Sequence, residues 1–192
     1  LQSGFKVLFA GNIGSAQSMK TIVSAAEALK THADIKIVLL GSGSKLDWVA
    51  QQSFNKGLGN IHIEGKRPVE MMPLLMRQAS ALLVTLTNQP IFELTIPSKI
   101  QAYLAVGRPI IACLNGEGAK TVNDAQAGIS VSAEDGKGLA EAVLRLYRMS
   151  VEERKKMGDN GRAYFKQHFD EEMLTSNLIL KFEDLINEKG NH

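Results

Sequence analysis

Short apolar runs that alternate with amphipathic, helix-length segments are the feature that most constrains how this chain folds. The first two runs, FKVLFA at 5–10 and IKIVLL at 35–40, each end at a glycine. Continuous apolar runs of this length are typical of parallel strands buried on both faces. Between the two runs, apolar residues recur at the spacing of one helix face, at Met19, Ile22, Val23, Ala26 and Leu29.

The same alternation continues along the chain. Further strands are predicted at 61–63, 81–86, 109–114 and 128–131. Helices are predicted at about 46–54, 69–78, 98–106, 119–126, 137–149, 151–168 and 171–188. This order predicts an α/β fold, namely a Rossmann-like, open, mostly parallel sheet of about six strands with helices on both faces. No linker or repeat divides the sequence, so residues 1–192 are expected to form a single domain.

Composition narrows the functional classes. The formal net charge of +2 gives no indication of nucleic-acid binding, which favours a strong basic excess. Cys113 is the only cysteine, which excludes an internal disulfide and suits a cytoplasmic protein. No apolar run approaches the length of a membrane span. The chain has no initial methionine and enters a strand at Phe5, from which we expect a processed chain or an excised domain.

Loops that follow the strands are the first places to look for a ligand, because open parallel sheets bind ligands beyond the carboxyl ends of their strands. Gly11, Asn12 and Gly14 follow the first strand, where glycine lets the backbone approach a phosphate and a helix start supplies free amides. Alternatively, the glycines only make the turn. The loop that begins at Gly41 after the second strand is open to the same two interpretations.

These glycine loops do not match the common nucleotide motifs. The G-x-x-G spacing differs from the G-x-G-x-x-G of dinucleotide enzymes, and no carboxylate follows the second strand, so NAD is not expected. No G-x-x-x-x-G-K-[ST] motif is present. The sequence predicts no bound cofactor.

A third candidate region surrounds Pro97. Ser98 and Gln101 have the spacing of a capping box, which predicts Ser98 as the N-cap of a helix. Lys99 then falls in the first helical turn, where the helix dipole disfavours a cation. A bound anion would relieve that conflict, so Lys99 is predicted to contact a pyrophosphate.

The sequence around these residues resembles a known family. PSKIQAYLAVGRPIIA at 97–112 is similar to the PSK…G-x-P signature of family 4 retaining glycosyltransferases, which have the two-domain GT-B fold. FAGNIG at 9–14, LLGSGS at 39–44, IHIEGKRP at 61–68 and the tail with Arg162, Tyr164 and Phe165 follow in the family's order. Within the family, the stretch from Thr95 to Ala119 looks most like fucosaminyl transferases of bacterial O-antigen and capsule clusters.

The resemblance implies that this chain is the C-terminal half of a glycosyltransferase. In the family that half binds a nucleotide-diphosphate sugar, and a separate N-terminal domain, absent here, binds the acceptor. The expected reaction is a metal-independent, retaining transfer with a donor that is UDP-linked, in surface polysaccharide synthesis. The expected acceptor is a lipid-linked sugar at the cytoplasmic membrane face. This chain alone is expected to transfer no sugar.

Departures from the family's pattern shift the expected phosphate contacts. The family places an arginine and a lysine on the phosphates, and the corresponding positions here are Asn12 and Gln17, which are neutral. Lys99, Lys66 and Arg67 are therefore the candidates for positive charge. Lys66 and Arg67 are open to a second interpretation, as a solvated pair in a loop.

The family's glutamate pair is also incomplete. The second glutamate, which usually holds the ribose, falls on Ala102, and the first falls on Leu94, next to Glu93. Thr95, Pro97 and Ser98 remain as predicted diphosphate contacts before Lys99. Glu117 is a candidate for contact with sugar hydroxyls, or else part of a turn and helix cap.

The chemistry expected of such a site needs no metal. A nucleoside diphosphate is a good leaving group, so pre-aligned amides and a cation are enough to stabilise its developing charge. The sequence has no Asp-x-Asp motif and its histidines are scattered, so a metal site is not expected. No catalytic group is assigned. Two alternatives remain, namely a GT-B-like nucleotide-sugar epimerase and a non-catalytic nucleotide-binding module.

Overall fold

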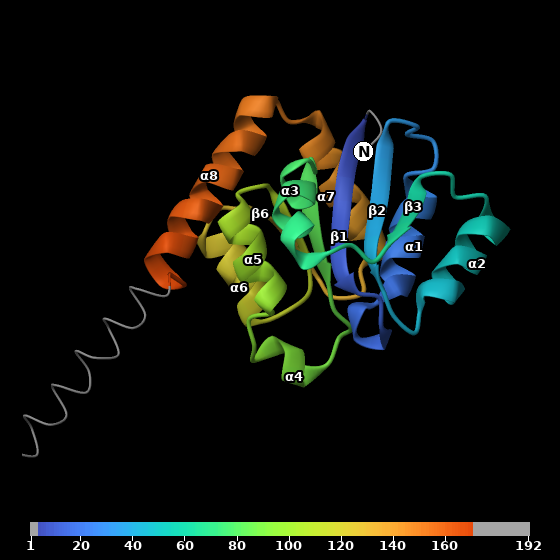
Figure 1. Cartoon of the computed structure of the whole chain (residues 1–192), viewed down its shortest axis with the longest axis horizontal. Helices are drawn as coiled ribbons and strands as arrows, with labels where there is room; N and C mark the ends of the chain where they lie inside the picture. The colour runs from blue at the N-terminus through green and yellow to red at the C-terminus, as the bar shows by residue number, and fades with distance from the viewer. Residues whose placement is uncertain (1–3, 171–192) are drawn as a thin grey trace, which may run out of the picture.

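The computed structural model describes residues 4–170, in which a parallel sheet lies between two layers of helices (Figure 1). The strands are β1 (Phe5–Asn12), β2 (Ile35–Ser42), β3 (Ile61–Gly65), β4 (Ala81–Thr85), β5 (Ile110–Cys113) and β6 (Gly128–Val131). They are arranged in the order β3-β2-β1-β4-β5-β6, and every neighbouring pair is parallel. The predicted fold class is confirmed.

Each face of the sheet has its own hydrophobic core. Helices α1 (Met19–Ala28), α2 (Leu46–Lys56) and α7 (Gly136–Arg148) pack on one face. Helices α3 (Met72–Arg77), α5 (Ser98–Val106), α6 (Glu117–Asp124) and α8 (Val151–His168) pack on the other. Successive strand residues point to opposite faces, so continuous apolar runs such as 5–10 supply both cores.

Three short helical segments refine the predicted elements. The predicted helix at 69–78 is divided into a 3-10 turn, η2 (Val69–Met71), and α3. A second 3-10 turn, η1 (Ser15–Gln17), precedes α1, and α4 (Pro90–Glu93) was not predicted. The helix predicted at 171–188 lies outside the described residues.

The strand order changes direction at β1. From β1 the chain adds β2 and β3 on one side, and then returns to add β4, β5 and β6 on the other. In sheets of this kind the connections leave the carboxyl ends of the two central strands in opposite directions, which opens a crevice between them. The crevice here is expected beyond the ends of β1 and β4.

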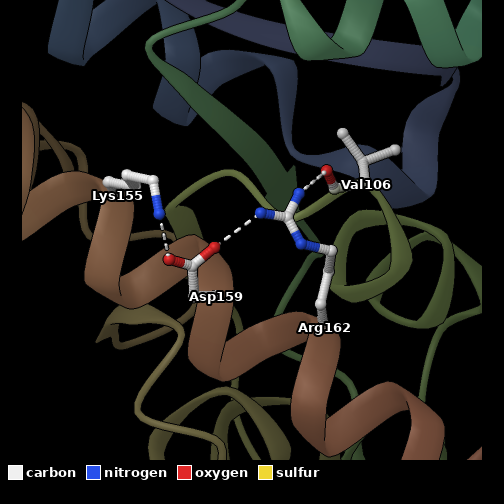
Figure 2. Close-up of polar contacts among 4 residues, drawn as sticks. All are labelled: Val106, Lys155, Asp159 and Arg162. Atoms are coloured by element: carbon white, nitrogen blue, oxygen red, sulfur yellow. Dashed lines mark hydrogen bonds and ion pairs between the residues drawn. The ribbon is translucent and has the colours of Figure 1, made fainter.

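Helix α8 is fastened to the end of α5 by polar contacts (Figure 2). The Arg162 guanidinium donates to the backbone oxygen of Val106 at 3.2 Å and pairs with Asp159 at 2.6 Å. Asp159 also pairs with Lys155 at 2.6 Å. Gly158 faces the backbone oxygen of Gly107 so closely that a Cβ at position 158 would overlap it. Close packing and paired charge therefore hold α8 in place.

Candidate nucleotide site at the carboxyl rim

The ends of β1 and β2 approach each other too closely for side chains. The two strands remain in register through Gly11 opposite Gly41 and Asn12 opposite Ser42. A Cβ at Gly41 would overlap the backbone oxygen of Gly11, and both glycines have positive φ angles of 150° and 128°. Glycine is therefore required here by space and by conformation. The glycine pair leaves an open backbone surface at the carboxyl ends of these strands. We call the residues Gly11, Asn12, Gly41, Thr95 and Lys99 the carboxyl rim.

The predicted GNIG loop differs from the structure in how its amides are used. Gly11 and Asn12 still belong to β1, and the Ile13 amide donates to the backbone oxygen of Ser42 at 2.8 Å. The Gly14 amide donates to Oε1 of Gln17 at 3.2 Å. The expectation of free helix-start amides at Ile13 and Gly14 is therefore wrong, because strand pairing and a local turn use them. Asn12 is exposed.

The start of α5 also differs from the prediction. Pro97 is the N-cap and makes no side-chain capping bond, so Ser98 is the first helical residue and the predicted capping box is wrong. The extended backbone of Pro97, with ψ of 135°, already turns the chain into the helix. The Ile100 amide donates to the backbone oxygen of Pro97 at 2.8 Å. The Ser98 and Lys99 amides have no acceptor four residues earlier, as is general at helix starts.

Lys99 reaches from α5 across the crevice to β1. Its ammonium lies 3.9 Å from the centre of the Phe9 ring, and a Cβ placed on Gly11 would lie 3.1 Å from Nζ. Among residues 4–170 no carboxylate pairs with it. Burial lowers the pKa of Lys99 from 10.5 to about 8. A half-buried ammonium that lies over an aromatic face and pairs with no carboxylate of residues 4–170 is suited to bind an anion. The predicted convergence of Gly11 and Asn12 with Lys99 is present.

A groove of about 460 Å³ lies on the β2 side of the rim. It is lined by Gly11, Asn12 and Gly41 together with Lys66 and Arg67 from the segment after β3. Arg67 donates to the Glu64 carboxylate at 3.2 Å, and both side chains are more than one-third exposed. Lys66 and Arg67 therefore line the same groove as the glycine pair, and both are exposed, so both interpretations of this pair remain open.

The other predicted residues lie on the β5 side. Glu93 ends α4, and a Cβ at Gly116 would overlap its backbone, so the turn before Glu117 lies directly against it. Glu117 is the first residue of α6 and is exposed, as are Glu93 and Thr95. Leu94 is 77% exposed. Neither Glu93 nor Glu117 has an ion-pair partner within the described part of the chain.

Two residues that support the site were not found from the sequence. Phe9 supplies the ring beneath Lys99. The buried Tyr103 hydroxyl lies 3.2 Å from the Ala10 amide, which donates to it, and 3.4 Å from the backbone oxygen of Leu83. Tyr103 therefore ties β1 to β4 directly below the crevice. The sequence does contain a signal for this role of Tyr103. It follows Lys99 by four residues, and residues four apart share a helix face.

Comparison with known proteins identifies the family. The sequence pattern of the family described as glycosyl transferases group 1 matches residues 4–149. The chain belongs to this family.

Relatives of this group 1 chain include two curated bacterial proteins. It is 22% identical over 165 residues to WbjE of Pseudomonas aeruginosa, a probable glycosyltransferase, and this match covers 85% of the chain and 40% of WbjE. It is 29% identical over 103 residues to WcaI of Escherichia coli (strain K12), a proposed colanic acid biosynthesis glycosyl transferase, covering 53% of the chain and 24% of WcaI. The chain thus spans less than half the length of either relative.

Solved structures share the fold of this group 1 chain. Anabaena HepE, determined in complex with UDP, superposes with a TM-score of 0.81 at 17% identity, covering 95% of this chain and 49% of HepE. The C-terminal domain of LpcC, a group 1 glycosyl transferase of Francisella tularensis, superposes with a TM-score of 0.72 at 20% identity and covers 88% of each chain. The chain therefore has the fold of a Rossmann-like half of the GT-B architecture. The more specific resemblance to fucosaminyl transferases is not tested by these matches.

Within residues 4–170, no helix is both long and apolar enough to cross a membrane. The same residues hold no group of three His, Cys, Asp or Glu side chains arranged as metal ligands.

Proposed function

We propose that this chain is the donor-binding domain of a retaining glycosyltransferase whose donor is a UDP-linked sugar. Lys99 carries the proposal, because a half-buried ammonium with no carboxylate partner within residues 4–170 lies across the crevice beside Gly11. A diphosphate there would supply the missing negative charge. HepE, whose fold is shared, has been determined with UDP and with UDP-glucose, which favours uracil as the base.

The proposed mechanism assigns roles to this chain's own residues. The Lys99 ammonium, with the Ser98 and Lys99 amides, stabilises the charge that develops on the diphosphate as the sugar leaves. Gly11 and Gly41 let the donor lie against the backbone, and Asn12 and Gln17 offer neutral contacts. Lys66 and Arg67 line the nucleoside end. Thr95 and Pro97 are assigned to the diphosphate beside Ser98, and Glu93 and Glu117 are assigned to contacts with the nucleoside or the sugar hydroxyls.

The proposal extends to the whole protein. Because the chain spans only part of its relatives' length, we propose that residues 1–192 form one donor domain and that a preceding domain binds the acceptor. The names of the relatives support a role in bacterial surface polysaccharide synthesis. The acceptor would then be a lipid-linked sugar, and the protein would work in the cytoplasm at the inner membrane face.

Titration calorimetry of the 192-residue chain with UDP and GDP tests the proposal. UDP is expected to bind, GDP to bind more weakly, and neither to require a divalent cation. Absence of heat with both nucleotides would contradict donor binding.

A second experiment separates the transferase from the epimerase. The protein extended upstream is incubated with UDP-sugar alone, and an isomerised sugar would indicate an epimerase. Binding without transfer to any lipid-linked acceptor would indicate a non-catalytic module.

A further inference from the structure

A groove with basic walls lies at the amino ends of β4 and β5. It has a volume of about 440 Å³ and is lined by residues 77–80, residues 106–109 and four residues of α8. Ser80 directly precedes β4 and Pro109 directly precedes β5, so the groove lies at the opposite end of the sheet from the carboxyl rim. Its volume is within the range of small-molecule sites.

The charges that line this groove are all positive within residues 4–170. They are the side chains of Arg77, Arg108, Arg154, Lys155 and Arg162. Lys155 and Arg162 share one carboxylate, because Asp159 pairs with each of them at 2.6 Å (Figure 2). No carboxylate of residues 4–170 pairs with Arg77, Arg108 or Arg154. The groove therefore has a clear excess of positive charge.

Helix ends hold three of the guanidiniums in position. Arg108 donates to the backbone oxygen of Arg77 at the end of α3, and Arg162 donates to that of Val106 at the end of α5. Arg154 donates through Nη1 to two backbone oxygens at the end of α7. These oxygens carry only partial charge, and a guanidinium has five N–H donors. Arg108 and Arg154 therefore keep both their formal charge and further donors.

The packing of α8 brings these cations close together. A Cβ on Gly158 would overlap the backbone oxygen directly before Arg108, so α8 lies tightly against the turn that carries Arg108. Arg154 and Lys155 reach the groove from the first turns of α8, and Arg77 reaches it from the end of α3. Like charges held together repel, and an anion with several charged groups would relieve the repulsion. The planar fork of arginine suits phosphate oxygens in particular.

We propose that this groove binds a compact, soluble polyphosphate anion, with its phosphate groups between Arg77, Arg108 and Arg154 and with Lys155 at the edge. Arg162 stays paired with Asp159. The groove is concave, which suits a soluble anion better than the flat surface of a membrane. The inference goes beyond the proposed donor function and does not depend on it, because this groove shares no lining residue with the groove at the carboxyl rim.

Sodium tripolyphosphate is the probe, titrated into the full chain at constant ionic strength while amide chemical shifts are followed. Shifts are expected at Gln78, Arg108 and Val151, with affinity at least tenfold above that for inorganic phosphate. The probe should also raise the melting temperature, because it would join the end of α3 to the start of α8 and binds only the folded chain.

Arg77→Gln is the variant that tests the site. It is expected to weaken tripolyphosphate binding about tenfold, because a charge-assisted contact is lost. Arg77 is exposed and pairs with no carboxylate of residues 4–170, so the melting temperature without the probe should stay unchanged. Arg145→Gln is the matched control, because Arg145 is an exposed arginine of α7 that does not line the groove. It should bind the probe as the unchanged chain does.

Four results would overturn the proposal. Equal affinity for tripolyphosphate and inorganic phosphate would indicate general attraction of anions, and so would equal losses of binding in Arg77→Gln and Arg145→Gln. Binding to phosphatidylglycerol vesicles without binding of tripolyphosphate would indicate a membrane surface. The fourth result is the absence of shifts at Gln78, Arg108 and Val151, whether the probe binds nowhere or only near Gly11 and Lys99 at the proposed donor site.

Discussion

Arg162 and Lys99 are both long cations that lie against another element, but their surroundings differ. Arg162 pairs with Asp159 and donates to Val106, so its charge is used to fasten α8 to α5 (Figure 2). Lys99 lies over the Phe9 ring and has no carboxylate partner in the described part of the chain. Buried charge is costly unless it is paired. The contrast indicates that Arg162 stabilises the fold, and it supports the proposal that Lys99 binds a ligand.

Replacement of Lys99 is expected to have the largest effect of the substitutions that test this contrast. Lys99→Met is expected to lower the affinity for UDP about 10- to 100-fold, because a hydrogen bond to a charged group is lost. Titration calorimetry measures the change, with Lys120→Met as the matched control. Equal affinities for UDP in Lys99→Met and the unchanged chain would show that Lys99 has no part in the site.

Stability should depend on pH through Lys99. Its pKa is lowered from 10.5 to about 8 by burial, so between these pH values the unfolded chain binds the proton and the folded chain does not. The Lys99 contribution to the free energy of unfolding therefore rises with pH across this window, on the order of 1–2 kcal/mol after allowance for partial exposure. Above about pH 9 the buried Cys113 thiol, whose pKa is raised to about 11, opposes this rise. The difference in urea unfolding between the unchanged chain and Lys99→Met, followed from about pH 7.5 to 10.5, isolates the Lys99 contribution and should change with pH.

Replacement of Arg162, the paired cation, should lower stability and leave UDP affinity almost unchanged. Arg162→Met is expected to lower the free energy of unfolding by about 1–2 kcal/mol, because the bonds to Val106 and Asp159 are lost. UDP affinity should stay within twofold, since Arg162 lies outside the rim. Denaturant unfolding and calorimetry on the same sample give both values. A loss of UDP binding without a loss of stability would reverse the assigned roles.

Ser150 and Ser98, at the starts of α8 and α5, allow a further comparison in which the expected changes in stability are smaller. Ser150 is a true N-cap of α8, because its Oγ accepts from the Glu153 amide at 3.1 Å and the Glu153 carboxylate accepts from the Ser150 amide at 2.7 Å. Ser150→Ala is expected to cost about 1 kcal/mol of stability. Ser98→Ala should cost less than about 0.5 kcal/mol, because Ser98 caps nothing. Equal losses in thermal unfolding would contradict the observed start of α5.

Local sequence patterns were sufficient to predict the fold. The apolar runs located each of the six strands, because a strand buried on both faces leaves little freedom of composition. Strand ends were less predictable, since Gly11 and Gly41 read as loop residues and instead continue the ladder. Glycine is ambiguous in this way because it suits both a turn and a close backbone approach.

The site was predicted in outline. The conflict between Lys99 and the helix dipole pointed to the start of α5, where the structure places an ammonium with no carboxylate partner among residues 4–170. The capping box assigned to Ser98 was wrong, because Pro97 already turns the chain. The contact of Lys99 with Phe9 and the ties made by Tyr103 join segments about ninety residues apart. Only the crossover that places β4 beside β1 brings them together, and no local pattern encodes that distance.

The most direct test of the account is the pKa of Lys99 itself, measured by carbon-13 NMR of its Cε with and without saturating UDP. Without nucleotide the account predicts a pKa near 8, lowered by burial. With UDP, the diphosphate beside the ammonium should raise that pKa by at least two pH units, because an opposite charge favours the protonated form. A pKa that does not move when UDP binds would contradict the claim that Lys99 holds the diphosphate.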